Sequence, residues 1–475
     1  MKKKYVRWTL WTIASPFILF IILCILIYLP PIQNFLVDKA AVYASEATGM
    51  NISVGRISLS FPLNLVVTNV DAASPHNDTL LSVRRLQVNV QLLPLLKKQV
   101  EVDGISLQGA TVNSNDLIHG MKLNGTLGEL FISSHGVALD PETAIVNKVL
   151  LKDTDLSLCL NDTAAADTAA SDTAYWKIIL QDIDLQNVSF ALDMPLDSLS
   201  LAASLDNAIL RDGLIDLHKS AYSLQTFRIE NGRVRYDNGK PLAADSLSSG
   251  LDPSHIALTD IGVKLDSLYY GGRNMKAIIS QFVLKERSGV EIVSATGRMV
   301  SNDKVLRVPS LKLETRDSYL ELNAAMDWNA LDFKDEGLVS ARLMADIGKP
   351  DVVRFMGSMD EKFIRQYPSE PLRIRTGIDG DLNKLKLTTL TAELPGALGL
   401  FARGELTHLT DSLLRGGDIT LEAETKDLKF VSTLAEGIEI PYGTRLEGKF
   451  TMAGTKMGTD LLLMQPEAQA VVAAD

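Results

Sequence analysis

Histidine, cysteine, aspartate and glutamate are the residue types that could do chemistry in this chain of 475 residues. No two histidines stand at metal-ligand spacing, none lies beside a cysteine, and no H-E-x-x-H pair occurs. The sequence also lacks a G-x-S-x-G elbow, a P-loop and a G-x-G-x-x-G loop. We therefore predict no metal, no cofactor and no local catalytic motif. The histidines are His76, His119, His135, His218, His255 and His408.

The carboxylates are plentiful, but they fall in turns and on the polar positions of expected strands, as in "LNDT" and "DGDL". Carboxylates at such places are ordinarily solvated surface. An acid–base pair drawn from distant strands leaves no local trace, so an enzyme anchored to the cell envelope stays open as a distant alternative. We expect a protein that is not an enzyme.

Charge and cysteine content exclude two further classes. The formal net charge is −11, and no basic patch offsets it, so nucleic-acid binding is not expected. Cys24 and Cys159 are too few for a disulfide framework. Cys24 also lies inside a long hydrophobic segment, so we expect no bridge between the two cysteines.

That hydrophobic segment, residues 12–29, is long enough to span a bilayer at about 1.5 Å per residue. The positive charges precede it, so residues 1–11 form a cytoplasmic basic stub and the rest of the chain is sent across the membrane. A cleaved signal peptide is the competing interpretation, but its apolar region would be shorter and would end at a small-x-small site. Residues 30–48 are expected to form a short helix that stops at Gly49. The predicted anchor residues are Trp8, Trp11, Phe17, Phe20 and Tyr28.

Beyond the anchor, strand patterns dominate. From Ile57 to Val67 every odd position is apolar, which predicts a strand with one wet and one apolar face. A longer unit then recurs, in which the apolar alternation is interrupted by Asn, Gly or Asp and resumes in opposite phase. Its copies start at residues 65, 105, 149, 183 and 227. Such a phase change indicates a bulge or tight bend with left-handed backbone. The expected bend residues are Asn69, Gly109, Asp153, Asn187 and Asn231.

A repeat of this size is typical of stacked β architecture. Two segments depart from the strand pattern. Residues 161–175 contain Asp-Thr-Ala three times and are expected to form a flexible surface loop. Residues 350–367 begin with Pro350 and have partly helical spacing, so we expect a helix there. The whole of 49–475 is thus expected to be one repetitive, mainly β region.

The anchor, the short helix and "TGMNISVGRISLSFPLNLVVTNV" resemble the AsmA-like superfamily, and more narrowly the N-terminal part of TamB-type translocation and assembly module proteins. "VQLLPLLKKQVEVDGISLQGATV" continues the likeness, which is specific over residues 1–113 and a matter of pattern beyond them. TamB-type chains are usually longer and close with a domain that engages an outer-membrane partner, a barrel of the Omp85 type. No such domain is recognisable here, so we expect a fragment.

The resemblance implies an elongated, bent antiparallel-type sheet that forms a U-shaped, taco-like hydrophobic groove. It also implies phospholipid transport from the inner to the outer membrane, with the bulk of the chain in the bacterial periplasm. The Asp-Thr-Ala copies look like the O-glycosylation acceptor of Bacteroidota. The acceptor threonines would be Thr163, Thr168 and Thr173.

What the apolar strand faces touch is the central question. They could fill a dry β-sandwich core, or they could line a groove whose exposed apolar area is covered by lipid tails. The length and recurrence of the units, the anchor and the resemblance favour the lipid groove. A scaffold that captures client β-strands at its sheet edges is the alternative function. The groove candidates are Ile57, Leu59, Phe61, Leu63, Leu65, Val67, Leu86, Val88, Val90, Ile105, Leu107, Leu156, Leu158, Ile183, Leu185, Phe190, Phe227, Ile229 and Val234.

Overall fold

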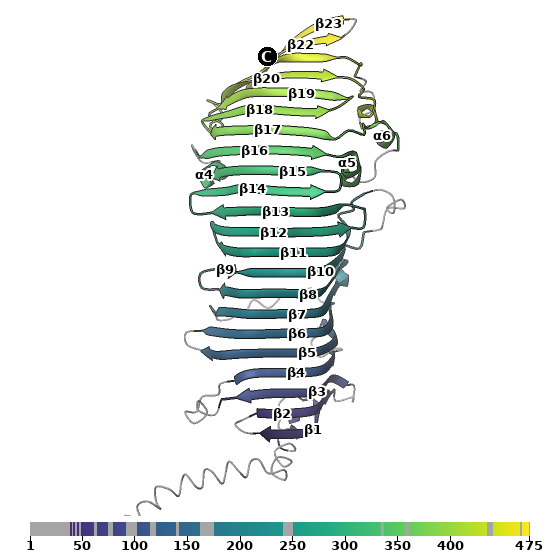
Figure 1. The fold of residues 1–475 in the computed structure, drawn as a ribbon, viewed down its shortest axis with the longest axis vertical. Coiled ribbons are helices and arrows are strands. Elements are labelled where there is room, and N and C mark those ends of the chain that lie inside the picture. The colour runs from purple at the N-terminus through teal and green to yellow at the C-terminus, as the bar shows by residue number, and fades with distance from the viewer. Residues whose placement is uncertain are drawn as a thin grey trace, which may run out of the picture. The chain divides into compact units, whose positions relative to one another are not determined.

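A computed structural model describes the chain from residue 39 to residue 474 with gaps (Figure 1). The gaps are residues 40, 43–44, 47–48, 61–63, 75–78, 92–101, 115–119, 139–141, 162–174, 241–249, 334–336, 357–360, 435–439 and 466–467. The predicted anchor, the acceptor threonines, and Phe61 and Leu63 lie outside the described residues. Within the described part, no helix has the length and the apolar character needed to cross a membrane.

The fold is mainly β, as the alternating patterns predict, and it divides into two compact units, Met1–Ile209 and Leu210–Asp475. The strands of the first unit are β1 (Asn51–Ser60), β2 (Asn64–Ala73), β3 (Thr79–Val90), β4 (Val102–Asn113), β5 (Met121–Ala138), β6 (Thr143–Leu160) and β7 (Lys177–Met194), followed by the 3-10 helix η1 (Pro195–Asp197). β8 (Leu199–Asp216) runs across the division.

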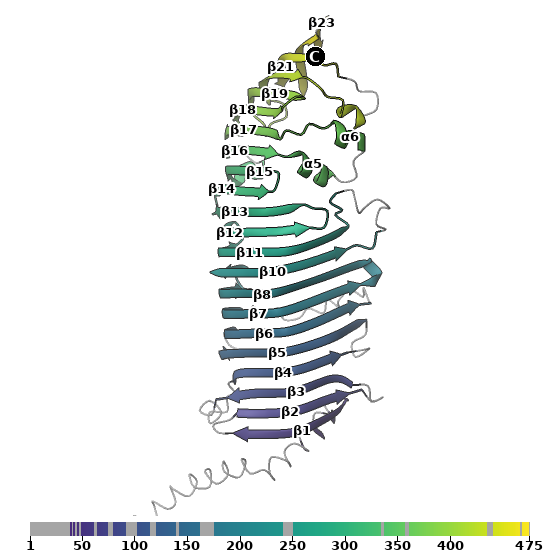
Figure 2. The ribbon, with the colours of Figure 1, turned by 45° about the vertical axis from the view of Figure 1, so that its right-hand side comes forward.

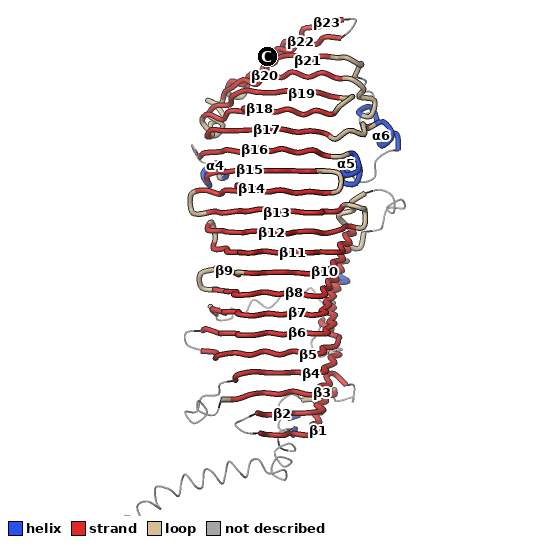
Figure 3. Tube along the Cα trace, viewed as in Figure 1, coloured by secondary structure: helices blue, strands red, loops and turns tan. Residues whose placement is uncertain are grey.

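The second unit is also a meander of strands, with short helices at the strand ends (Figure 3). Its strands are β9 (Ala221–Leu224), β10 (Thr226–Asp237), β11 (His255–Gly271), β12 (Asn274–Glu286), β13 (Glu291–Ser301), β14 (Val305–Thr315), β15 (Tyr319–Asp327), β16 (Leu338–Ile347), β17 (Leu372–Asp381), β18 (Lys384–Leu394), β19 (Leu398–Thr407), β20 (Gly416–Thr425), β21 (Arg445–Ala453), β22 (Lys456–Gln465) and β23 (Ala468–Ala474). Its helices are α4 (Trp328–Leu331), α5 (Lys349–Met356), α6 (Glu361–Gln366) and η2 (Val431–Thr433).

The helix expected over residues 350–367 is present in two pieces, α5 and α6, on either side of residues outside the description. Near the start of the chain, the described residues between 39 and 46 are helical. The Gly49 N–H donates to the Ser45 carbonyl at 2.9 Å, and the φ of Gly49 is 70°. This is the left-handed helix end that glycine favours, and it stands where the sequence places the stop.

In the first unit, consecutive strands from β1 to β6 pair antiparallel, whereas β7 runs parallel to β6. The parallel pair was not expected, and it explains why one interval of the repeat, from Asp153 to Asn187, is shorter than the two before it. The bend residues of β2, β4 and β6 are 40 to 44 residues apart in sequence, because each interval contains an outgoing and a returning strand. Asp153 and Asn187 are only 34 apart and pair directly across β6 and β7.

The bend positions align across the strands of the first unit. All five expected bend residues have a φ between 50° and 62°, and those of β2, β4, β6 and β7 lie on one line across the sheet. The intervening strands cross the line at Gly55, Arg84 and Gly128, none of which has a positive φ. Figure 2 shows strands of this unit changing direction part-way along their length. We call the line the corner, and its members are Gly55, Asn69, Arg84, Gly109, Gly128, Asp153 and Asn187.

Two clusters of buried apolar side chains occur among the described residues, and both lie in the second unit. The larger packs α6 and the segment after β20 against the ends of β17, β18 and β19. Its centre is Phe363, whose ring centroid is 5.5 Å from that of Tyr367 and 5.8 Å from that of Phe430. Burial raises the pKa of the Tyr367 phenol. The smaller cluster packs Ala330 of α4 against Val339 and Leu382.

Candidate apolar binding face

The strand register of the first unit joins apolar side chains into continuous rows. Residues directly opposite each other on neighbouring strands share a face, so each row can be followed from β1 to β7. On one side of the corner the rows are Ile57–Val67–Leu86–Leu107–Leu130–Leu151–Leu185 and Leu59–Leu65–Val88–Ile105–Ile132–Val149–Ile183. On the other side they are Val54–Val70–Val83–Ala110–Leu127–Thr154–Val188 and Ile52–Ala72–Leu81–Val112–Gly125–Leu156–Phe190.

We call the surface made by these four rows the inner face. It carries no charged residue, and Thr154 is its only polar side chain. The adjacent row of the opposite surface, the outer face, is polar throughout: Arg56–Thr68–Arg85–Gln108–Glu129–Lys152–Gln186. At about 4.8 Å between neighbouring strands, each row crosses about 29 Å of apolar surface.

Burial at the corner shows which face is concave. The inner-face row beside the corner contains Val83, Ala110 and Thr154, which are only 5%, 9% and 2% exposed. Of the corner residues, all except Gly109 and Gly128 are exposed, and those two are half-buried. Side chains inside a bend are crowded by both arms of the strand, and those outside it are not. The apolar face is therefore the inside of the bend.

Away from the corner, the inner face is not packed as a core is. Every described groove candidate is half-buried, except Phe190, which is 39% exposed. A strand face covered by a second sheet would place such side chains below a tenth exposed, as in a protein interior. Among the described residues, no buried apolar cluster forms on the strands of the first unit. The dry-sandwich interpretation does not fit this surface.

The structure brings together the candidates in β1 to β7 and places Phe227, Ile229 and Val234 in β10 of the second unit. Sequence reasoning missed the β5 members Leu127, Leu130 and Ile132. It also missed two bends, Asp212 and Asp260, whose φ values are 51° and 52°. The bend at Asp260 could have been predicted, because the apolar alternation is interrupted between Leu258 and Ile261 and resumes in opposite phase, as at the five expected bends. Asp260 accepts a hydrogen bond from Lys285 Nζ at 2.8 Å, which raises the pKa of Lys285.

The second unit has apolar rows of its own, which cross β14 to β22. They differ in composition, because small residues alternate with leucines and the most buried members are Ala345 and Ala402, at 2% and 3% exposed. The rows are Leu313–Leu320–Ala345–Ile374–Ala392–Leu400–Ala423–Leu446–Leu463 and Leu311–Leu322–Leu343–Thr376–Leu390–Ala402–Leu421–Gly448–Leu461.

At one end of this surface the chain covers itself. Leu372, Leu394 and Leu398 pack under Phe363 and Tyr367. Helix α5 is held nearby by Asp351, which is 1% exposed, accepts hydrogen bonds from Thr315 and Ser318, and pairs with Arg354 at 3.1 Å. Where the fold supplies an apolar cover, this face is buried; elsewhere the leucines of the two rows stay half-exposed, and the small side chains Ala345 and Ala402 are buried.

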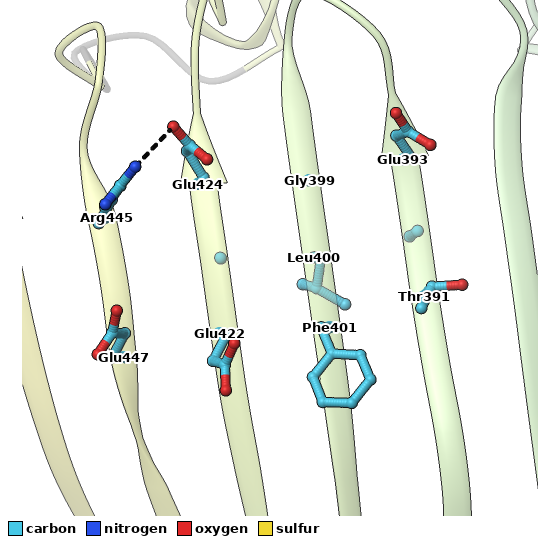
Figure 4. Close-up of a pocket in the computed structure, with 11 residues that line it drawn as sticks. Thr391, Glu393, Gly399, Leu400, Phe401, Glu422, Glu424, Arg445 and Glu447 are labelled. Atoms are coloured by element: carbon cyan, nitrogen blue, oxygen red, sulfur yellow. Dashed lines mark hydrogen bonds and ion pairs between the residues drawn. The ribbon is translucent and has the colours of Figure 1, made fainter.

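In the second unit, the strand surface opposite the apolar rows has a shallow depression of about 440 Å³ above Gly399 (Figure 4). Its rim is charged, with Glu393, Glu422 and Glu447, and Arg445 pairs with Glu424 at 3.4 Å. Within the described ranges, no three side chains of histidine, cysteine, aspartate or glutamate gather as a metal site requires. The depression results from the missing side chain of Gly399 in a charged strand surface.

No protein-family model matches the chain, and no curated protein matches it significantly.

Proposed function

We propose that this chain is an envelope protein, anchored in the bacterial inner membrane by residues 12–29, whose inner face shields phospholipid acyl chains during transport between the inner and outer membranes. One observation carries the proposal. Four uncharged rows cross the first unit from β1 to β7 on the concave side of a bend, and they stay half-exposed over most of their length.

The energetics favour a lipid occupant. Exposed apolar surface costs roughly 25 cal/mol per Å², and a soluble protein rarely leaves a continuous apolar surface open. An acyl chain reaches about 15 Å, half of the bilayer hydrocarbon core, so a row of about 29 Å is long enough to hold one. Hydrophobic contact is non-directional. Tails could therefore slide along the rows, while a headgroup stays in water at the open side.

The resemblance of residues 1–113 to the AsmA-like superfamily supports the same function. It adds the compartment and the direction, and an outer-membrane barrel of the Omp85 type as a partner beyond this chain. The predicted anchor would hold the first unit beside a source of lipid. No step of this process requires a catalytic group or a cofactor.

Site-specific photocrosslinking in living cells tests the proposal. A diazirine amino acid at Val88 lies in an inner-face row, and at Gln87 it lies one residue away on the opposite face of the same strand. Lipid adducts at Val88 and none at Gln87 are expected. Protein adducts, or no adducts, at Val88 would overturn the lipid-shielding function.

A charge on the inner face provides a second test and separates the alternative function. Leu107→Asp should abolish lipid co-purification, whereas Gln108→Asp on the outer face should leave it unchanged. Urea denaturation of both variants controls for folding. If the protein instead captures client strands at its edge, Pro or Lys substitutions in β1 would abolish function and Leu107→Asp would not.

A further inference from the structure

Large apolar side chains are exposed to solvent on one side of the second unit, where β19 connects to β20 and β21 connects to β22. We call this line of strand ends the edge of the second unit. Leu413 and Leu414, in the connection from β19 to β20, are 79% and 64% exposed, and Met457 at the start of β22 is 75% exposed. The two places touch, because the Gly454 N–H donates to the Arg415 carbonyl at 2.7 Å. Among the described large apolar side chains, none is more exposed than Leu413 and Met457.

The leucines are held outward by an ordered turn. Asp411 Oδ1 accepts hydrogen bonds from the Leu413 N–H at 2.8 Å and from the Leu414 N–H at 3.2 Å. The Asp411 carbonyl also accepts the Arg415 N–H at 2.8 Å. A turn closed by three hydrogen bonds cannot easily fold its side chains back onto the sheet. We call residues 411–415 the leucine turn.

This edge is continuous with the apolar rows of the second unit. Met457 pairs with Met452, which pairs with Gly417, which pairs with Leu406. These residues alternate in phase with the apolar rows on β19, β21 and β22, so they lie on the same face. An acyl chain could pass from the edge onto that face without crossing a polar row.

One exposed cation flanks the exposed apolar groups. Lys456 precedes Met457 and forms no ion pair with any described residue. Arg415, which ends the leucine turn, is half-buried, and its Nε is buried. Of the acids nearby, Asp418 pairs with Lys449, and Asp411 is exposed and holds the turn through backbone N–H groups. Apolar side chains with adjacent basic residues are typical of segments that enter the interface of an anionic bilayer.

We propose that the leucine turn and Met457 dock into the surface of an anionic phospholipid bilayer, at the edge where acyl chains enter or leave the apolar rows. This inference rests on the proposed lipid-shielding function. A bilayer fits better than a protein partner, because three side chains cover far less than the roughly 800 Å² per partner of a stable protein interface.

The test uses the full chain with Cys24→Ser and Cys159→Ser, carrying an environment-sensitive fluorophore at Leu414→Cys. It is reconstituted with vesicles of phosphatidylethanolamine and phosphatidylglycerol, with and without lipids that bear a nitroxide on the acyl chain. The matched control carries the fluorophore at Leu196→Cys, a position that is 63% exposed in the first unit. We expect a blue shift and nitroxide quenching at 414 and neither at 196. Lys456→Gln should weaken the partition of the turn by about fivefold, the effect of one basic residue near an anionic surface.

No quenching at 414 would overturn the docking. A blue shift that follows protein concentration without quenching would assign the turn to a protein interface and would also overturn it. Crosslinking at Val88 distinguishes the two failures. Lipid adducts at Val88 without quenching at 414 leave the shielding function intact and remove only the docking. Quenching at 414 without adducts at Val88 removes the shielding function and the role of the turn in lipid entry, and leaves only contact with the bilayer.

Discussion

The Asn187 side-chain amide donates to Asp153 Oδ1 at 2.9 Å, and both residues have left-handed backbone, with φ values of 52° and 50°. The two side chains lie opposite each other on the parallel strands β6 and β7. The corner therefore continues through a place where the strand direction fails to alternate, the parallel pair among the described strands β1 to β7. Short polar side chains that tolerate positive φ and bond to each other keep the bend aligned.

Replacing Asn187 with valine should destabilise the first unit. A β-branched residue in left-handed backbone costs about 1–2 kcal/mol, and the bond to Asp153 is lost as well. Asn187→Gly loses the bond but keeps the conformation, so it should be the milder change. Urea denaturation would measure both, and equal stabilities would show that positive φ is not needed there.

Gly128→Ala should be costly even though Gly128 has no positive φ. An added Cβ would lie 2.7 Å from Asp153 Cβ and 2.9 Å from two backbone oxygens of β6. We expect a loss of about 1–3 kcal/mol in the free energy of unfolding. Gly399→Ala is the control, because a Cβ there meets nothing within 4 Å. A neutral Gly128→Ala variant would mean that the strands at the corner separate easily.

Phe363→Ala should destabilise the second unit by about 3–5 kcal/mol, because it removes the centre of the cluster under α6. Phe363 is 2% exposed, whereas Phe355 on α5 is 56% exposed. Phe355→Ala should therefore change stability by less than about 0.5 kcal/mol. Chemical denaturation followed by circular dichroism would compare them. Similar losses in the two variants would contradict the assigned cluster.

Asp252 should contribute to stability in a pH-dependent way. Its carboxylate lies 2.7 Å from His255 Nδ1 and accepts the Ser254 N–H at 2.9 Å, and these hydrogen bonds lower the pKa of Asp252 below 3.8. A lowered folded-state pKa means that the contribution is complete above the unfolded value and is lost as the pH falls through the folded value. The stability difference between the wild type and Asp252→Asn should therefore shrink as the pH falls below about 5. A difference that stays constant would contradict the pairing.

The local features of this protein could be predicted from residue types and their spacing. Apolar alternation has a period set by the strand backbone, so it predicted the strands around Ile57, Val88 and Ile183. Left-handed backbone depends on the residue type, so the phase changes at Asn69, Gly109, Asp153, Asn187 and Asn231 predicted where φ becomes positive. The segment 350–367 showed its helical spacing in the same way.

How those features combine depends on the tertiary structure. Strand pairing depends on hydrogen bonds between residues far apart in sequence, so no local pattern could show that the bends align with Gly55, Arg84 and Gly128, or that β7 runs parallel to β6. An alternating strand is equally compatible with a covered and an uncovered apolar face. The half-exposed rows beside a crowded corner resolve that ambiguity, because exposure depends on which elements pack against the face.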